Sequence, residues 1–270
     1  NTRAIEALED LAEDESLLEE IAGDVLVPYY QASAQWQKMV DILDRRQLAE
    51  HDPQERSRLL MQIGATRAEQ LGDVDGAFDA LADAWTMDVE NPDLRELVIG
   101  LAAQHEAWER LAQILRDVIP EVRDPDALLA FNLQLAALYR DYLENPAEAE
   151  IYYREALNID EESIDAFRAL EEILRSDQRW HDLVELLERR FNIQITTGDG
   201  QAVELLHQIA TIQDEMLEDG FTAVETYARV LEFDPTEDAA VSALDRLYRD
   251  QERWEDLSML LNDQISLSSE

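Results

Sequence analysis

The sequence predicts an all-α protein, a right-handed α-solenoid of about fifteen antiparallel helices. Three observations carry this prediction. A phrase that begins with tryptophan recurs at a fixed long period, which is the signature of stacked repeats. The alternation of apolar and polar residues that is typical of strands is absent. Glycine and proline are scarce, at 8 and 7 residues of 270, so we expect the helices to be joined by short loops.

Four tryptophans set the period, with spacings of 72, 72 and 74 residues: Trp36, Trp108, Trp180 and Trp254. The phrases that they open are WQKMVDIL, WERLAQIL, WHDLVELL and WEDLSMLL. In the third phrase, Trp180, Leu183 and Leu187 fall on one face of a helix. We therefore expect each phrase to form an amphipathic helix, with the four indole rings buried in equivalent positions between successive helix pairs.

The rest of each period aligns as three further helices. The second segments contain Leu59, Phe131 and Leu205, and the fourth segments begin at Pro92, Ile164 and Asp238. The third segments read GAFDALADAW, EAEIYYREAL and TAVETYARVL. The breaks carry turn and capping residues, at Gly72-Asp73, Asn145-Pro146, Asp219-Gly220 and Asp234-Pro235. One period therefore holds four helices, or two helix pairs.

The N-terminal region departs from this pattern. About eighteen extra residues precede the first tryptophan and indicate an inserted helix with Pro28 inside it, where proline kinks or ends a helix. The domain prediction is a segment of irregular helices over residues 1–34, followed by one continuous solenoid over residues 35–270. The chain begins with Asn1 rather than methionine, which suggests a processed form or an excised piece.

The helix pair over residues 131–160 resembles the tetratricopeptide repeat (TPR). The matching positions are Leu135, Ala136, Tyr139, Ala149, Tyr153, Ala156 and Asp160. The pair over residues 202–235 matches again, whereas the pairs that end in a tryptophan helix depart, with Glu171 at a position where a small residue is usual. The layout also resembles long TPR-like proteins of high-GC bacteria such as the myxobacterial group. The resemblance implies a concave face, lined by the first helix of each pair, that grips peptides or helices of partner proteins.

Charge narrows the class of partner. The chain has 62 acidic and 22 basic residues, for a formal net charge of -40. Nucleic acid and anionic membranes are therefore poor partners, because phosphate binding needs Lys and Arg. A basic protein or peptide fits better. The acidity has an alternative explanation, a solvated coat that reflects a high-salt or GC-rich origin, and Lys38 as the one lysine agrees with it.

No pattern of catalytic, cofactor-binding or metal-binding residues stands out. The chain has no cysteine, and its four histidines, His51, His105, His181 and His207, show no metal-ligand spacing. The stretch that begins at Asp73 lacks the later ligands of a calcium loop. No apolar run approaches the roughly 18 residues that a membrane span needs. We therefore expect a protein that is not an enzyme, holds no cofactor and does not insert into membranes.

Two groups of residues are candidates for partner binding. The tyrosines are Tyr29, Tyr139 and Tyr142, although the helical spacing of aromatic residues also fits plain core packing. The acids lie between Arg3 and Lys38, a stretch with nine acidic residues and no basic one, and the candidates there are Glu6, Glu9, Glu13 and Glu19. A solvated helix face is the alternative for these acids.

The function that the sequence indicates is a non-catalytic scaffold that presents a concave, acidic repeat surface to a protein or peptide. The alternatives are a regulatory or substrate-recruiting segment of a larger enzyme and an assembly component that polymerises through its repeat ends. The last helix carries Leu257, Leu260, Leu261, Ile265 and Leu267 on an apolar face that no later helix covers. We expect either a longer native chain or end-to-end self-association there. The sequence leaves the compartment open between cytoplasm and periplasm.

Overall fold

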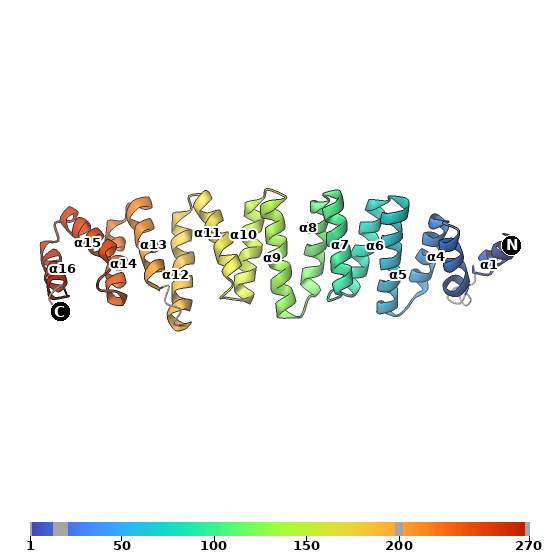
Figure 1. The fold of residues 1–270 in the computed structure, drawn as a ribbon, viewed down its shortest axis with the longest axis horizontal. Helices are drawn as coiled ribbons and strands as arrows, with labels where there is room; N and C mark the ends of the chain where they lie inside the picture. The colour runs from blue at the N-terminus through green and yellow to red at the C-terminus, as the bar shows by residue number, and fades with distance from the viewer. Residues whose placement is uncertain (1, 13–20, 198–201, 268–270) are drawn as a thin grey trace. The chain divides into compact units, whose positions relative to one another are not determined.

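The computed structural model describes residues 2–12, 21–197 and 202–267. Every regular element in these ranges is helical, with fifteen α-helices and four short π or 3-10 turns (Figure 1). The prediction of an all-α solenoid of about fifteen helices is confirmed, whereas the right-handed twist stays a prediction. The chain forms two compact units, residues 1–149 and residues 150–270, which are described separately below.

The first unit is a run of helices in which each packs on the next. Its α-helices are α1 (Thr2–Leu11), α3 (Val27–Ala32), α4 (Trp36–Ala49), α5 (Pro53–Thr66), α6 (Val74–Met87), α7 (Pro92–His105), α8 (Trp108–Val118) and α9 (Pro125–Asp141). Its short turns are the π-helical η1 (Ala22–Leu26) and η2 (Arg67–Leu71) and the 3-10 turn η3 (Ile119–Glu121). From α3 to α9, consecutive helices are in contact, which is the expected arrangement of stacked pairs.

The second unit repeats the same arrangement. It holds α11 (Ile164–Ser176), α12 (Trp180–Thr197), α13 (Ala202–Thr211), α14 (Gly220–Phe233), α15 (Asp238–Asp250) and α16 (Trp254–Leu267), with the π-helical turn η4 (Ile212–Met216) after α13. From α11 to α16 each helix again contacts the next. Helix α10 (Pro146–Ile159) crosses the boundary between the two units.

The period of four helices is confirmed. The first period comprises α4 to α7, the second α8 to α11 and the third α12 to α15, and each of the helices α4, α8, α12 and α16 begins at one of the four tryptophans. Equivalent residues of the first and second periods lie 72 positions apart, and after residue 202 those of the second and third lie 74 apart. Residues of different periods are compared below in this register.

The expectation that the four period-setting tryptophans are buried is wrong. Trp36, Trp108 and Trp180 are only half-buried, and Trp254 is 58% exposed. Each is the first residue of its helix, and a helical side chain leans back toward the helix N-terminus, so the indole covers the helix end instead of entering the core. The fully buried tryptophan is Trp85 in the last turn of α6, whose indole meets the ring of Phe131 edge-on at 5.7 Å.

Small residues set the close approach of the helices. The alanines expected at these positions are fully buried: Ala136, Ala149, Ala156, Ala210 and Ala223. Between α5 and α6 even a methyl group does not fit, because a Cβ on Gly64 would lie 2.6 Å from Cγ of Leu81. Gly64 therefore allows the contact between α5 and α6.

The turns inside the helix pairs repeat as regularly as the helices. One residue of each turn adopts a left-handed conformation, at Ala34, Glu106, Gln178 and Glu252 before the tryptophan helices and at Gly72, Glu144 and Glu218 in the other pairs. The next N–H group donates to a carbonyl five residues earlier in the first set and six residues earlier in the second. These bonds satisfy carbonyl groups that a helix end would otherwise leave unpaired.

Pro28 lies inside a helical run, as expected, and the local geometry explains how it is tolerated. It is the second residue of α3, directly after η1, where the Val27 N–H donates to the Ala22 carbonyl five residues back. A π-helical turn widens the helix at the point where proline cannot donate and where its ring would clash with the preceding turn. The earlier part of the expected inserted helix, residues 13–20, lies outside the described residues.

Candidate interaction surface

The N-terminal acid Glu9 forms contacts inside the first unit. Its carboxylate accepts hydrogen bonds from the Tyr30 hydroxyl and from Lys38 Nζ, the latter at 2.7 Å. The bonds from Lys38 and then Tyr30 hold the pKa of Glu9 below its usual range. Burial, followed by the bond to Glu9, raises the pKa of Tyr30 well above its ordinary value. Glu9 therefore ties α1 to α3 and α4, and this structural role accounts for the residue.

The other N-terminal candidates are more accessible. Glu6 is exposed and Tyr29 is half-buried, with its ring edge-on to Tyr30 at a centroid distance of 5.7 Å. Glu13 and Glu19 lie outside the described residues. Beside Glu9 there is a small hollow of about 240 Å³, which Tyr30, Lys38, Asp41, Ile42 and Arg45 also line.

The two tyrosines of α9 and its C-terminal end differ in access. Tyr139 is 7% exposed and belongs to the core, so its ring is not offered to a partner. Tyr142 is 55% exposed and its ring lies over Trp108, with centroids 4.1 Å apart and planes tilted by 30°. Tyr142 and Trp108 thus form an aromatic pair at the surface, and neither lines the hollow beside Glu9.

A larger groove, which the sequence did not suggest, lies in the first unit between α5, η2, α6 and α7. Its volume is about 540 Å³, within the range of roughly 300–1,000 Å³ that is typical of ligand pockets. The floor is apolar or lacks side chains, and consists of Gly64, Ala65, Ala68, Leu81, Leu97, Gly100 and Leu101. The rim is polar and carries Glu69, Asp93, Glu96 and Gln104. We call this hollow the α5–α7 groove.

The rim of the α5–α7 groove is acidic and has no basic counterpart. Within the described residues, Glu69, Asp93 and Glu96 form no ion pair, and no Lys or Arg lines the groove. Asp93 lies in the first turn of α7, where the positive end of the helix dipole favours a carboxylate. The floor includes Leu97, a large apolar side chain that is 37% exposed. The groove therefore combines an apolar floor with uncompensated negative charge.

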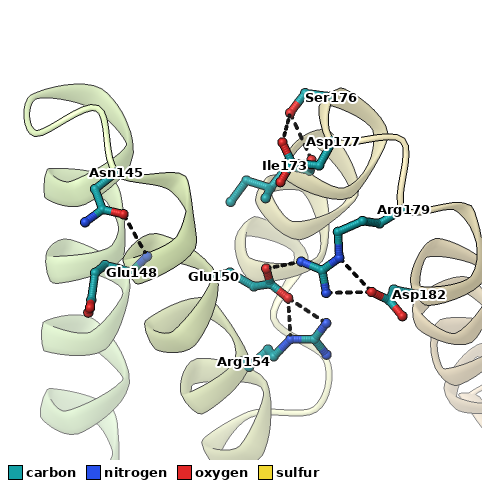
Figure 2. Close-up of polar contacts among 9 residues, drawn as sticks. All are labelled: Asn145, Glu148, Glu150, Arg154, Ile173, Ser176, Asp177, Arg179 and Asp182. Atoms are coloured by element: carbon teal, nitrogen blue, oxygen red, sulfur yellow. Dashed lines mark hydrogen bonds and ion pairs between the residues drawn. The ribbon is translucent and has the colours of Figure 1, made fainter.

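Elsewhere, arginines connect neighbouring helices within each unit. Figure 2 shows Glu150 of α10 accepting from Arg154 at 2.8 Å and from Arg179 at 2.5 Å, while Arg179 also pairs with Asp182 of α12. Burial alone would raise the pKa of Glu150, but the bonds from Arg179 and Arg154 outweigh it and leave that pKa below its usual value. Such pairs engage basic residues within the chain, so fewer arginines remain to offset the surplus of acidic residues.

The histidines of the chain lie apart from one another in the sequence, and most of them are exposed. His51, His105 and His181 are exposed, and His207 packs edge-on against Tyr227 at 5.8 Å. Among the described residues no group of three or more His, Asp or Glu side chains is placed to hold a metal ion. None of the described helices is long and apolar enough to cross a membrane. Asp73, at the start of the sequence that lacked later calcium ligands, caps α6 by accepting from the Gly76 N–H.

The expectation of an uncovered apolar face on the last helix holds for three of its five residues, since Leu261, Ile265 and Leu267 are 42%, 65% and 40% exposed. For Leu257 and Leu260 it is wrong, because both are buried within the second unit. In the first and third periods the tryptophan helices α4 and α12 pack on the helices that follow them, α5 and α13. Self-association through this face of α16 stays a prediction.

Solved structures that are similar to this chain include TPR-repeat proteins. MamA aligns with 64% of this chain and 96% of its own, at 13% identity and a TM-score of 0.35. PilF of Pseudomonas aeruginosa aligns with 87% and 99%, at 13% identity and a TM-score of 0.35. The C-terminal part of a TPR repeat-containing protein from Cytophaga hutchinsonii aligns with 90% and 94%, at 14% identity and a TM-score of 0.38. No protein-family model and no curated protein matches the sequence. Because these TM-scores are low, the fold assignment rests on the helices and their period.

Proposed function

We propose that this protein is a non-catalytic repeat scaffold that binds a basic protein or peptide through the face formed by the first helices of its pairs. The single observation that carries the proposal is the α5–α7 groove, which joins an apolar floor to three carboxylates that no described base neutralises. Such a groove suits a segment that brings both apolar side chains and positive charge.

The charge of the whole chain supports the same kind of partner. With a net charge of -40, acids greatly outnumber the bases that could neutralise them. Several arginines are already paired between helices, as Arg67 is with Asp44 at 2.9 Å and Arg229 is with Glu188 at 2.9 Å. The field that remains outside is negative, and it attracts basic partners and repels nucleic acid and anionic lipid.

The proposal is tested by titrating the protein into fluorescein-labelled peptides of equal length, one rich in arginine and one rich in glutamate. We expect anisotropy to report binding of the arginine peptide alone, with an affinity that falls steeply as salt rises, because salt screens charge attraction. No binding of the arginine peptide at low salt would contradict the proposal.

A parallel measurement separates partner binding from a purely protective acidic coat. If the acids only serve adaptation to salt, thermal melts should show the protein becoming more stable as salt screens the repulsion among them, with no peptide bound in the first experiment. A regulatory segment of a larger enzyme would use the same peptide-binding face, so peptide binding does not distinguish it from a separate scaffold. The sequence of the full gene distinguishes the two.

A further inference from the structure

The α5–α7 groove has a counterpart two periods later, where different side chains occupy the same positions. In the second unit, Asp214 of η4 and Arg246 of α15 form an ion pair between the two elements. The equivalent residues of the first unit are Ala68 of η2 and Gly100 of α7, which line the groove. A Cβ on Gly100 would meet no atom within 4 Å, so this position opens onto empty space. The bridge of the third period is thus absent from the first.

The rim differs between the same two places. Asp93 and Glu96 of the first unit correspond to Ala239 and Ser242 of the third period, so two of the three rim carboxylates have no counterpart in the third period. The exposed Leu97 corresponds to the smaller Ala243. Compared with the third period, the first unit therefore has an open groove with more negative charge and a larger apolar surface.

We propose that the α5–α7 groove is a specificity pocket that takes one leucine-sized aliphatic side chain of a partner segment, with the adjacent Lys or Arg residues held by Glu69, Asp93 and Glu96. This inference rests on the proposed function and names the chemistry that the scaffold selects. The aliphatic side chain lies over Leu97 and the space above Gly100, where it is removed from water. The flanking cations meet carboxylates on both walls, because Glu69 belongs to η2 and the other two acids belong to α7.

The test uses two labelled peptides with equal charge, GRGRLRGRG and GRGRARGRG, which differ only in the central leucine or alanine. We expect the wild-type protein to bind the leucine peptide about tenfold more tightly, which is the order expected for burying the larger side chain. Anisotropy titrations at low salt measure both affinities.

The decisive variant transplants the ion pair of the third period. Ala68→Asp with Gly100→Arg adds one negative and one positive charge, so the net charge of the protein is unchanged while the groove is bridged. We expect the preference for leucine to fall below about twofold, while the alanine peptide binds as before. The matched control is the reverse exchange in the second unit, Asp214→Ala with Arg246→Gly, which should keep the tenfold preference.

Folding of the double variant is checked by a thermal melt, and Gly100→Arg alone serves if the double variant is unstable. Its arginine lies at an exposed helical position with free space around the new Cβ, and it should also abolish the preference for leucine. An equal preference in the wild type and in the groove variants would overturn the inference, as would no preference in the wild type. Failure of both peptides to bind would instead overturn the proposed function.

Discussion

Helices α6 and α14 are equivalent and each 14 residues long, but they bury different aromatic side chains, Phe78 and Trp85 in α6 and Tyr227 in α14. Tyr227 is 4% exposed and lies edge-on to His207 of α13. The equivalent residue of α6 is Leu81, which lines the α5–α7 groove, and the large ring comes one turn later as Trp85. At that position α14 has Leu231.

This one-turn shift shows how a repeat can change its surface without changing its backbone. In the first unit the ring packs against Phe131 of α9, away from the groove, and only leucine remains at the groove floor. In the third period the ring stays on the groove side, where its hydroxyl lies 3.3 Å from Thr211 Oγ1. Trp85 and Tyr227 are both buried, but only Trp85 lies outside the lining of the groove position, so the groove of the first unit stays open.

The largest effect should come from Trp85, because it is the largest side chain that is fully buried. We expect Trp85→Ala to lower the free energy of unfolding by about 3–5 kcal/mol, the usual loss for a large aromatic residue in a core. Trp254→Ala is the matched control, since its ring is 58% exposed, and it should change stability by less than about 1 kcal/mol. Urea unfolding followed by circular dichroism measures both. Equal losses would mean that the period-setting tryptophans stabilise the core after all.

The next effect compares two glycines that both line the α5–α7 groove, Gly64 and Gly100. Gly64→Ala places a Cβ against Leu81, and overpacking of about 1–3 kcal/mol should exceed the helix-propensity gain of about 1 kcal/mol. Gly100→Ala gains the same propensity with free space around it, so it should stabilise the protein by about 0.5–1 kcal/mol. Opposite signs in urea unfolding are the expected result. If both substitutions stabilise the protein, the Leu81 side chain can shift to make room for the new methyl group, and the packing between α5 and α6 is not tight at Gly64.

The sequence predicted the helices well because their signals are local and repeat. The tryptophans marked the starts of α4, α8, α12 and α16, and residues such as Asp73 and Asp219 marked caps by their side-chain chemistry. The burial of the tryptophans was predicted wrongly, because a helical period fixes which face a residue occupies and does not show whether another helix covers that face at the helix end.

The α5–α7 groove escaped prediction for a different reason. A groove exists where side chains are small or missing, and residues such as Ala68 and Gly100 carry no signal when read alone. The signal was present in the comparison of equivalent positions, where Asp214 and Arg246 face each other across the same gap. Likewise, left-handed turns at glutamates such as Glu106 could not be foreseen, because only glycine announces that conformation.

A smaller effect is expected from Glu150, whose ion pairs represent the polar contacts between helices of the second unit. Its pKa is depressed in the folded protein, so its contribution is present above the unfolded value of 4.5 and is lost as pH falls through the folded value. Glu150→Gln should therefore lower stability by about 1 kcal/mol at neutral pH, and the difference from wild type should vanish in strong acid. Glu155→Gln, at an exposed site on the same helix, is the control. A difference that persists unchanged at about pH 3 would show that charge is not the cause.

The smallest expected effect concerns two equivalent turns, one in the first period and one in the third, where Gly72 corresponds to Glu218. Both are left-handed, with φ of 68° and 54°, and in both turns the next N–H group donates six residues back, from Asp73 to Arg67 and from Asp219 to Gln213. Because the turn geometry is shared, the side chain alone differs. A left-handed conformation costs a residue with a Cβ about 1–2 kcal/mol, and replacing that residue by glycine removes this cost. Glycine also has more conformational freedom in the unfolded chain, which lowers the gain in stability by about 0.4–1 kcal/mol.

We therefore expect Glu218→Gly to stabilise the protein by a few tenths to about 1 kcal/mol and Gly72→Glu to destabilise it by a similar amount. Glu225→Gly, at an exposed position inside α14, should lower stability by about 1 kcal/mol, because there glycine only adds freedom to the unfolded chain. Urea unfolding of the three variants tests the argument by sign. Destabilisation by Glu218→Gly would mean that the glutamate side chain makes a favourable contact that outweighs the strain of its backbone.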